Sequence, residues 1–428
     1  MHDNSVIQVD LGAISHNMRV LRRIVGPKVA ICPIVKADAY MLGAAKIARQ
    51  LAQYGANMLA VYTPQQAAEL NRAAITTPVL VLMPVRSIDR TDDLYRSLVA
   101  GRLHLAAHDL DHLGELTHIA ERFGAVIPVH IEVDTGMSRG GAVVEEAAEM
   151  IRRVSQHRWL RLAGVFTHFA EAEGDQRGTD RQLAEFDAML TTERSHLPAD
   201  CLVHVGNTFA TLRHRRYHRS MVRVGLAWAG YGLESMRGGD VIPAGEHLRP
   251  AVTWSSHIVH IKHLPPGATV GYGRGWTADR ASSIGLVPVG YADGYPVEAT
   301  SLNTADRAVY VALCREQDGV MKRWFCPVVG AVSMDQITID LTDAPMDVAR
   351  VGTRIEIITP DQQAPNHLTR LATIGRTIPH EMLCRLNPRL KRSYLHAPQP
   401  AVESPLPAAG KMAAPGKMAT QSPPRLAV

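Results

Sequence analysis

Cysteine is scarce in this sequence, and no two cysteines are closely spaced. The chain of 428 residues has five cysteines, an odd number, and none of them forms a CxxC pair. This pattern argues against a disulfide-linked fold, a zinc finger and a thioredoxin-like redox motif. We therefore expect reduced thiols, as is usual in the cytosol, and no metal site.

Long hydrophobic runs are also missing. No stretch approaches the roughly 18 apolar residues that a membrane helix needs. The first residues show no basic segment followed by an apolar one, which is the pattern of a signal peptide. From both observations we expect a cytoplasmic protein that does not contact the membrane.

Positive charge is neither abundant nor clustered. The 46 Lys and Arg residues stand against 41 Asp and Glu residues, a formal net charge of +5. Adjacent arginines form scattered pairs, such as Arg22 with Arg23, whereas a nucleic-acid-binding surface needs a clustered stripe. No nucleic-acid partner is expected.

A content of 46% hydrophobic and 20% charged residues is typical of a soluble globular protein, and the length favours two or three domains.

The first 230 or so residues alternate between short apolar runs and segments with helical spacing. Such alternation predicts parallel strands covered by helices on both faces. Eight such strands favour a closed (β/α)8 barrel of the TIM type, with an open doubly wound sheet as the alternative. The expected strands are 29–36, 58–62, 79–83, 103–107, 127–133, 162–168, 202–206 and 222–228, and clear helices are expected over 64–74, 111–123, 143–157 and 181–194.

The pattern changes near Pro250. Strand-like runs separated by turn signals follow, and no long helical pattern appears before Leu368, so we expect a second, mostly β domain. The domain boundaries are placed at 1–245 for the barrel and 246–395 for the β domain, and the Pro- and Ala-rich segment 396–428 is expected to be a disordered tail. The expected β-domain strands are 252–263, 283–289, 308–313, 324–329, 336–341 and 353–358.

Polar residues gather where the barrel strands end. Functional side chains of such barrels lie at the C-terminal ends of the strands, so polar residues that follow different strands converge on one pocket. The residues in question are Lys36, Asp38, Tyr40, Glu132, Asp134, Arg139, Thr167, His168, Asn207, Thr208, Arg223 and Gly225.

Lys36 stands out among these residues because it ends the apolar run Ile31–Val35. A lysine in that place is desolvated, and desolvation disfavours its ammonium form. A neutral lysine amine condenses with carbonyl groups, for example with that of pyridoxal phosphate. Taken alone, a lysine in this place is more often a strand-end residue that reaches solvent, because charged groups avoid burial. A hydroxyl from Tyr40, another from Thr208 and backbone groups near Gly225 could bind the cofactor's phosphate.

Eight short motifs occur along the chain in this order: 9–14 (VDLGAI), 35–40 (VKADAY), 133–139 (VDTGMSR), 167–169 (THF), 222–225 (VRVG), 270–273 (VGYG), 289–296 (VGYADGYP) and 332–335 (VSMD). Together they resemble the motifs of the alanine racemase family. Each motif alone is weak, but eight in collinear order over about residues 6–395 are highly specific. The resemblance implies a homodimer of a pyridoxal-phosphate barrel and a β domain, and we expect the first strand, about residues 6–12, to pack with the β domain.

The resemblance implies a racemase with two bases and pyridoxal 5′-phosphate as its cofactor. Lys36 would hold the cofactor and act as one base, and Tyr272 would be the other base, supplied by the β domain of the partner subunit. Racemisation removes the α-proton from one face of the carbanion and returns one to the other, so two bases on opposite faces perform it directly. The substrate would be a small amino acid, and supply of D-alanine for peptidoglycan is the implied role.

Further residues receive binding roles from the same resemblance. Arg139 would bind the cofactor's phenolic oxygen and the substrate carboxylate, His168 would pack against the ring, and Arg223 would face the pyridine nitrogen and keep it unprotonated. The implied cofactor-binding residues are Lys36, Tyr40, His168, Asn207, Thr208, Arg223, Gly225, Leu226 and His380; the implied substrate-binding residues are Arg139, Met334, Asp335 and Tyr291.

Three departures from the family pattern are informative. The lysine motif usually continues Gly-His-Gly, but here Met41 and Leu42 precede Gly43. Glu132 replaces a lysine that is often carbamylated, and we expect Glu132 to supply the negative charge and pair with Arg139. His380 replaces a tyrosine near the inner gate, and imidazole is shorter and can be charged, which makes a larger or more polar substrate such as serine plausible.

Three other functions are alternatives to alanine racemisation. A serine-preferring or broader racemase of the same family is the first. A decarboxylase or aldolase of this fold is another, but decarboxylases favour an acidic partner at the pyridine nitrogen, where Arg223 is expected. A catalytically silent cofactor-binding regulator is the third, and the presence of both Lys36 and Tyr272 argues against it.

Overall fold

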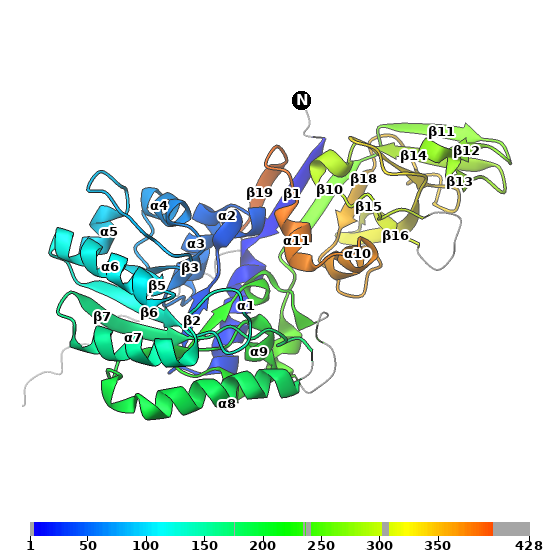
Figure 1. Ribbon diagram of the computed structural model, residues 1–428. Coiled ribbons are helices and arrows are strands. Elements are labelled where there is room, and N and C mark those ends of the chain that lie inside the picture. The colour runs from blue at the N-terminus through cyan, green and yellow to red at the C-terminus, as the bar shows by residue number, and fades with distance from the viewer. Residues whose placement is uncertain (1–3, 175, 234–235, 237–240, 302–307, 397–428) are drawn as a thin grey trace, which may run out of the picture.

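The computed structural model describes residues 4–174, 176–233, 236, 241–301 and 308–396, and these form a barrel and a strand-rich domain (Figure 1). The tail expected from residue 397 onward lies outside the described residues. All five cysteines are free thiols. Among the described helices, none combines the length and the apolar character that crossing a bilayer requires.

Eight parallel strands form the barrel, as the alternating pattern predicts. Strands β3 to β8 pair in order within one sheet, and β2 pairs with β9. Hydrogen bonds from Val35 N to Ala60 O (2.8 Å) and from Ser220 N to Val203 O (3.0 Å) join the two sheets and close the barrel. The strands are β2 (Ala30–Pro33), β3 (Leu59–Val61), β4 (Val79–Val81), β5 (Leu103–Ala107), β6 (Ile127–Glu132), β7 (Leu160–Phe166), β8 (Leu202–His204) and β9 (Met221–Val224).

Helices surround this barrel, and their ends follow from local residue types. The side chains of Thr63 and Gln66 form a capping box at the start of the helix that begins with Pro64. Asp109 accepts a bond from His112 N, and Gly124 ends the same helix in a left-handed conformation. The helices are α1 (Leu11–Val25), α2 (Lys36–Met41), α3 (Ala44–Gln53), α4 (Pro64–Arg72), α5 (Tyr95–Val99), α6 (Leu110–Phe123), α7 (Val144–Gln156), α8 (Gln176–Thr192) and α9 (Thr208–Arg213).

The strand-rich domain is built on a sheet of nine strands in the order β11-β14-β17-β16-β15-β18-β10-β1-β19. The first strand of the chain, β1, lies between β10 and β19 and pairs in parallel with β19. The elements are β1 (Ser5–Asp10), β10 (Val252–His257), β11 (His260–Leu264), β12 (Thr269–Val270), β13 (Trp276–Thr277), β14 (Ser282–Val287), β15 (Tyr310–Gln317), β16 (Val320–Val329), β17 (Ile337–Asp340), β18 (Arg354–Ile358), β19 (Lys391–Leu395), α10 (Leu368–Ile374) and α11 (Pro379–Cys384).

One predicted strand, 252–263, is wrong as a single element, because the chain changes partners in its middle. Ile258 N donates to Thr353 O, next to β18, whereas Val259 N donates to Leu286 O of β14. The segment therefore divides into β10 and β11, which pair with different strands. The apolar pattern runs through this division and gives no sign of it.

The segment that begins with Lys36 has an unusual backbone. Ala37, Asp38, Ala39, Tyr40 and Met41 all have φ between 52° and 61°, so α2 is a left-handed turn made without glycine. The left-handed conformation costs L-residues roughly 1–2 kcal/mol each. Such strain persists only where surrounding contacts determine the backbone, and it concentrates at functional sites.

The C-terminal strand supplies some of those contacts. Arg392 Nε donates to the carbonyl oxygen of Met41 (3.0 Å), and the Tyr394 hydroxyl donates to that of Leu42 (3.0 Å). A Cβ at Gly43 would lie 2.0 Å from the Tyr394 oxygen, so this close approach requires glycine. In Figure 1, β19 and α11 accordingly lie beside α2, between the barrel and the rest of the strand-rich domain.

Candidate active site

Lys36 follows β2 at the C-terminal end of the barrel, where the sequence places it. Its side chain is exposed in the single chain, but desolvation of the amine and the positive charge of Arg139 lower the pKa of Lys36. A lowered pKa increases the share of neutral amine, which is the form that attacks a carbonyl. Lys36 is therefore both accessible to a ligand and suited to covalent chemistry.

Tyr40, Thr208 and Gly225 lie in contact beside this lysine. A Cβ at Gly225 would lie 2.4 Å from the Tyr40 hydroxyl, so only glycine allows this approach. Thr208 Oγ1 accepts hydrogen bonds from Gly225 N (3.0 Å) and Ala227 N (3.4 Å). Because a hydroxyl that accepts two bonds still has its own proton to donate, Thr208 is suited to bind an anion. Tyr40 stacks on Trp228 at 5.7 Å, which fixes its ring.

Arg223 is buried inside the barrel, with 4% of its surface exposed. Its Nη1 donates to His204 O (2.7 Å) and to His204 Nδ1 (2.9 Å), and its Nη2 donates to Thr167 O (2.8 Å). Burial lowers the pKa of Arg223 to about 10, so the guanidinium remains charged at neutral pH. The side chain is thus a fixed cation that donates hydrogen bonds.

His168 lies next to this arginine. Arg223 Nη2 is 3.3 Å from His168 Nδ1. Burial, together with the charge of Arg223, lowers the pKa of His168 to about 3. His168 is therefore neutral, with Nδ1 as an acceptor and Nε2–H as a donor.

Asn207 and Leu226 have structural contacts of their own. The Asn207 side chain accepts a bond from Ala210 N (3.0 Å) and begins α9. Leu226 is fully buried at the start of the short turn after β9. A direct role for either residue in cofactor binding remains a prediction.

Glu132 does not form the ion pair that we expect from the sequence. Its Oε2 lies 3.1 Å from His108 Nδ1, and the other ring nitrogen of His108 contacts Leu82 O at 2.9 Å. No ion pair between Glu132 and Arg139 occurs in the part of the chain that the structure describes. The reason is that β5 ends next to β6 and delivers His108 to the carboxylate, whereas Arg139 lies in an exposed loop.

His380 lies in the candidate site, but as a neutral group. Its ring contacts the edge of Tyr40 at a centroid distance of 5.8 Å. Burial, with a smaller contribution from Lys36, lowers the pKa of His380 to about 4. His380 is therefore neutral at neutral pH, so its smaller size and its hydrogen-bonding capacity are what bear on specificity.

The four other expected site residues form a separate group in the strand-rich domain. Tyr272, Tyr291 and Met334 are 76%, 43% and 55% exposed. Tyr291 N donates to Ser333 O (3.1 Å), which places Tyr291 beside Met334, and Asp335 forms an ion pair with Arg389 at 3.0 Å. Over the described ranges, no hydrogen bond, ion pair or ring contact joins this group to Lys36.

Sequence reasoning missed several residues at the site. Trp228 not only stacks on Tyr40 but also donates Nε1–H to Ile34 O (3.0 Å). Cys384 follows His380 by one helical turn on α11, and its thiol and the Lys36 amine perturb each other's pKa. His204 accepts two hydrogen bonds from Arg223 Nη1 and so fixes its position. The sequence does offer a sign of His204, because it is a polar residue within an otherwise apolar strand.

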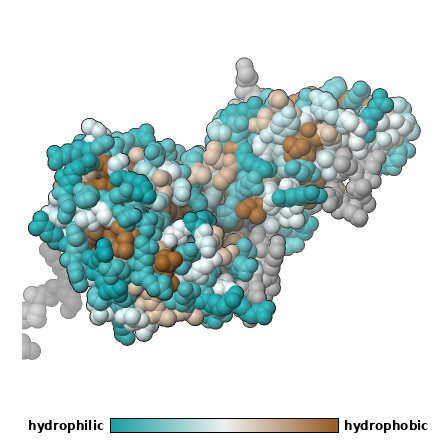
Figure 2. Space-filling model, in the orientation of Figure 1, coloured by the Kyte–Doolittle hydropathy of each residue, from teal (hydrophilic) through white to brown (hydrophobic). Residues whose placement is uncertain are grey.

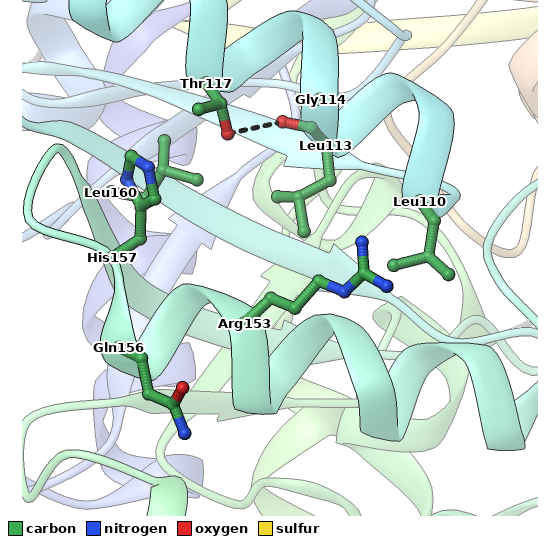
Figure 3. Close-up of a pocket in the computed structure, with 8 residues that line it drawn as sticks. All are labelled: Leu110, Leu113, Gly114, Thr117, Arg153, Gln156, His157 and Leu160. Atoms are coloured by element: carbon green, nitrogen blue, oxygen red, sulfur yellow. Dashed lines mark hydrogen bonds between the residues drawn. The ribbon is translucent and has the colours of Figure 1, made fainter.

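A pocket elsewhere on the barrel contains none of these residues. It lies between α6 and α7, has a volume of about 340 Å³, and includes Thr117, whose hydroxyl donates to Leu113 O at 2.9 Å (Figure 3). It is lined by Leu110, Leu113, Gly114, Thr117, Arg153, Gln156, His157 and Leu160. This pocket is therefore separate from the residues of the candidate site.

Comparison with known proteins identifies both domains. The family model for the N-terminal domain of alanine racemase matches residues 9–233, and the model for its C-terminal domain matches residues 251–394. The alanine racemase of Halothermothrix orenii is 32% identical over 392 residues, which cover 90% of this chain and 96% of that protein.

Solved structures agree with this result. The crystal structure of alanine racemase from Streptomyces lavendulae aligns with a TM-score of 0.78 and 27% identity, covering 92% of this chain and 98% of that one. The enzyme from Bartonella henselae, whose structure has covalently bound pyridoxal phosphate, aligns with a TM-score of 0.74 and 26% identity over 92% of this chain and all (100%) of that one. The motifs, the fold and these matches agree: the chain belongs to the alanine racemase family and is an isomerase.

Proposed function

We propose that this protein interconverts L- and D-alanine with pyridoxal 5′-phosphate held by Lys36. The observation that carries the proposal is the grouping of an accessible lysine of lowered pKa with Tyr40, Thr208 and Gly225. The covalent cofactor of the related Bartonella henselae structure supports the choice of ligand.

The residues present fit this cofactor. Tyr40 and Thr208 offer hydroxyl groups to a phosphate, and the missing side chain of Gly225 allows the Tyr40 hydroxyl to lie against the backbone there. Arg223 is charged at neutral pH and does not transfer a proton to its neighbours, but it can donate hydrogen bonds. An aromatic nitrogen that faces it would accept a hydrogen bond and stay unprotonated. The chain thus offers groups that suit both the phosphate of the cofactor and its pyridine ring.

The proposed chemistry requires two proton carriers on opposite sides of the substrate. When bound, pyridoxal phosphate withdraws electrons from an attached amino acid and so acidifies its α-proton. Lys36 takes or returns that proton on one side, since its lowered pKa increases the share of neutral amine. Tyr272 carries the proton on the other side, and Arg139 binds the substrate carboxylate through its planar fork.

Tyr272 would come from a second copy of the chain. Within one chain it is 76% exposed and belongs to the group in the strand-rich domain that, among the described residues, shares no hydrogen bond, ion pair or ring contact with Lys36. A homodimer that places Tyr272, Tyr291 and Met334 of one copy over Lys36 of the other would cover these exposed side chains. On the face that Figure 2 shows, hydrophobic residues form separate patches on both domains, between hydrophilic ones.

The test is chiral separation after incubation with substrate. The purified protein, loaded with pyridoxal phosphate, is given L-alanine or D-alanine, and each should approach the same equal mixture. L-serine is assayed in parallel. Racemisation of serine at a higher kcat/KM than alanine would overturn the substrate assignment, and no racemisation of either, with bound cofactor demonstrated by absorbance, would overturn the proposed function.

A further inference from the structure

Three buried histidines from three barrel strands form a continuous row that ends at Arg223. His104 Nδ1 lies 2.9 Å from His130 Nε2, and His130 Nδ1 lies 2.9 Å from His204 Nε2. His204 Nδ1 in turn lies 2.9 Å from Arg223 Nη1. These imidazoles are at most 6% exposed. The row runs from β5 through β6 to β8 and connects the barrel interior with the candidate site.

The arginine determines the direction of every hydrogen bond in this row. A guanidinium only donates, so His204 Nδ1 must be an acceptor, and the proton of a neutral His204 is then on Nε2. That proton is donated to His130 Nδ1, which places the His130 proton on Nε2, and this proton is donated to His104 Nδ1. All three rings are therefore fixed as the tautomer protonated at Nε2.

Burial keeps the three rings neutral, as this assignment requires. Desolvation is the largest cause that lowers the pKa of each of them, to about 4 for His104 and well below its usual value for His130 and His204. The positive charges of Arg223 and Arg161 act in the same direction. A second proton on any ring would face the N–H of the neighbouring donor. The three hydrogen bonds can therefore form only while all three rings are neutral.

Gly164 on β7 makes the row possible. In the sheet register Gly164 is opposite His130 on one side and Leu202 on the other. A Cβ at Gly164 would lie 2.2 Å from His130 Nδ1 and 2.9 Å from Leu202 O. The missing side chain therefore lets His130 pass across β7 and reach His204, although the strands that carry these two histidines are not neighbours.

We propose that His130 and His104 are positioning residues, which act through His204 to hold Arg223 in one orientation as a hydrogen-bond donor at the candidate active site. The inference rests on the proposed function for the role of Arg223, but the row itself is a property of the chain. Without His130, the Nε2–H of His204 is buried without an acceptor. The His204 ring can then turn away from the row, and Arg223 Nη1 loses the acceptor that fixes its orientation.

The first test reads the tautomers directly. ¹⁵N NMR of the cofactor-loaded protein with labelled histidine distinguishes protonated from unprotonated ring nitrogens, and the His204→Gln, His130→Gln and His104→Gln variants assign the signals. We expect the three histidines to be neutral, with the proton on Nε2. A signal for protonated Nδ1 on His204 in the wild-type protein would overturn the proposal, whatever the enzymatic activity.

The second test compares His130→Leu with His130→Gln. A glutamine amide can accept from His204 and donate to His104, so we expect it to retain most of kcat. Leucine leaves the Nε2–H of His204 without an acceptor and should lose about tenfold in kcat. Displacement of Arg223 should also raise the pyruvate released per alanine racemised, because a protonated pyridine nitrogen favours transamination. His367→Leu, which removes a buried histidine outside the row, controls for stability.

Two results would contradict the role in catalysis. One is a folded His130→Leu protein with unchanged kcat and unchanged pyruvate release. The other is an equal loss of kcat in His367→Leu, which would attribute the effect to general destabilisation. If His130→Leu does not fold, His104→Leu at the far end of the row provides the same comparison. A wild-type protein with the expected tautomers but no racemisation would refute the proposed function and leave the row intact.

Discussion

Arg392 donates a hydrogen bond from Nε to the carbonyl oxygen of Met41, and this bond ties the last strand of the chain to the left-handed turn that begins at Lys36. The same guanidinium also donates to the carbonyl oxygens of Leu386, Asn387 and Leu390. One half-buried cation thus joins four backbone positions. The placement of Lys36 in the barrel therefore depends on a residue more than 350 positions later in the sequence.

The Arg392→Lys variant should be less stable and should bind the cofactor more weakly. Lysine keeps the charge but cannot serve all four carbonyl groups, and an unsatisfied buried polar group costs about 1–3 kcal/mol. Thermal denaturation with and without pyridoxal phosphate measures both effects. Tyr394→Phe, which removes a single bond to Leu42 O, should give a smaller loss; equal stability of both variants and the wild type would show that these contacts do not hold the turn.

Replacement of Lys36 tests the covalent attachment. Lys36→Ala should lack the visible absorption band that borohydride removes from the loaded wild-type protein, and racemisation should fall to background. Lys46→Ala, which removes an exposed lysine of α3, should retain both. A reducible band in Lys36→Ala would show that another lysine holds the cofactor.

Removal of the Tyr272 hydroxyl tests the second proton carrier. Tyr272→Phe keeps the ring, so cofactor binding should survive, while kcat should fall by about 10²–10⁴-fold, the usual contribution of a general acid–base group. Steady-state rates in both directions, together with the absorption spectrum, separate the two effects. Unchanged turnover would reject Tyr272 as a base.

Mixed subunits test whether the site is shared between two chains. Neither Lys36→Ala nor Tyr272→Phe should be active alone, but a heterodimer has one site with both residues intact. Mixing the two variants should therefore restore part of the activity. If mass spectrometry demonstrates subunit exchange and no activity returns, the site is built within one chain.

His380→Tyr tests the basis of substrate choice. A tyrosine would fill more of the space beside Tyr40, and one altered pocket contact changes discrimination by roughly 10–200-fold. The kcat/KM ratio of alanine to serine should rise at saturating cofactor. A constant ratio with weaker cofactor binding would instead assign His380 to the phosphate side of the site.

The sequence predicts the barrel well because its strands are short apolar runs that alternate with amphipathic helices. It does not predict the turn after Lys36, because five successive non-glycine residues in the left-handed region contradict local preferences. It also misplaces Glu132, whose partner His108 comes from a neighbouring strand rather than from the loop with Arg139. The row through His104, His130 and His204 depends on the register across four neighbouring strands, β5 to β8, which spacing along the sequence does not reveal.

The parallel pairing of β1 with β19 has a consequence for how the protein is made. The two strands bracket the whole barrel in the sequence, so a ribosome releases the barrel long before the sheet can receive its last strand. Until then β1 has an open edge, and the turn at Lys36 lacks Arg392 and Tyr394. Barrel folding should thus precede cofactor capture, and a chain stopped after Asn387 should resist proteolysis in the barrel yet fail to form a reducible cofactor band. The chain should therefore become able to catalyse the reaction only when β19 has joined the sheet.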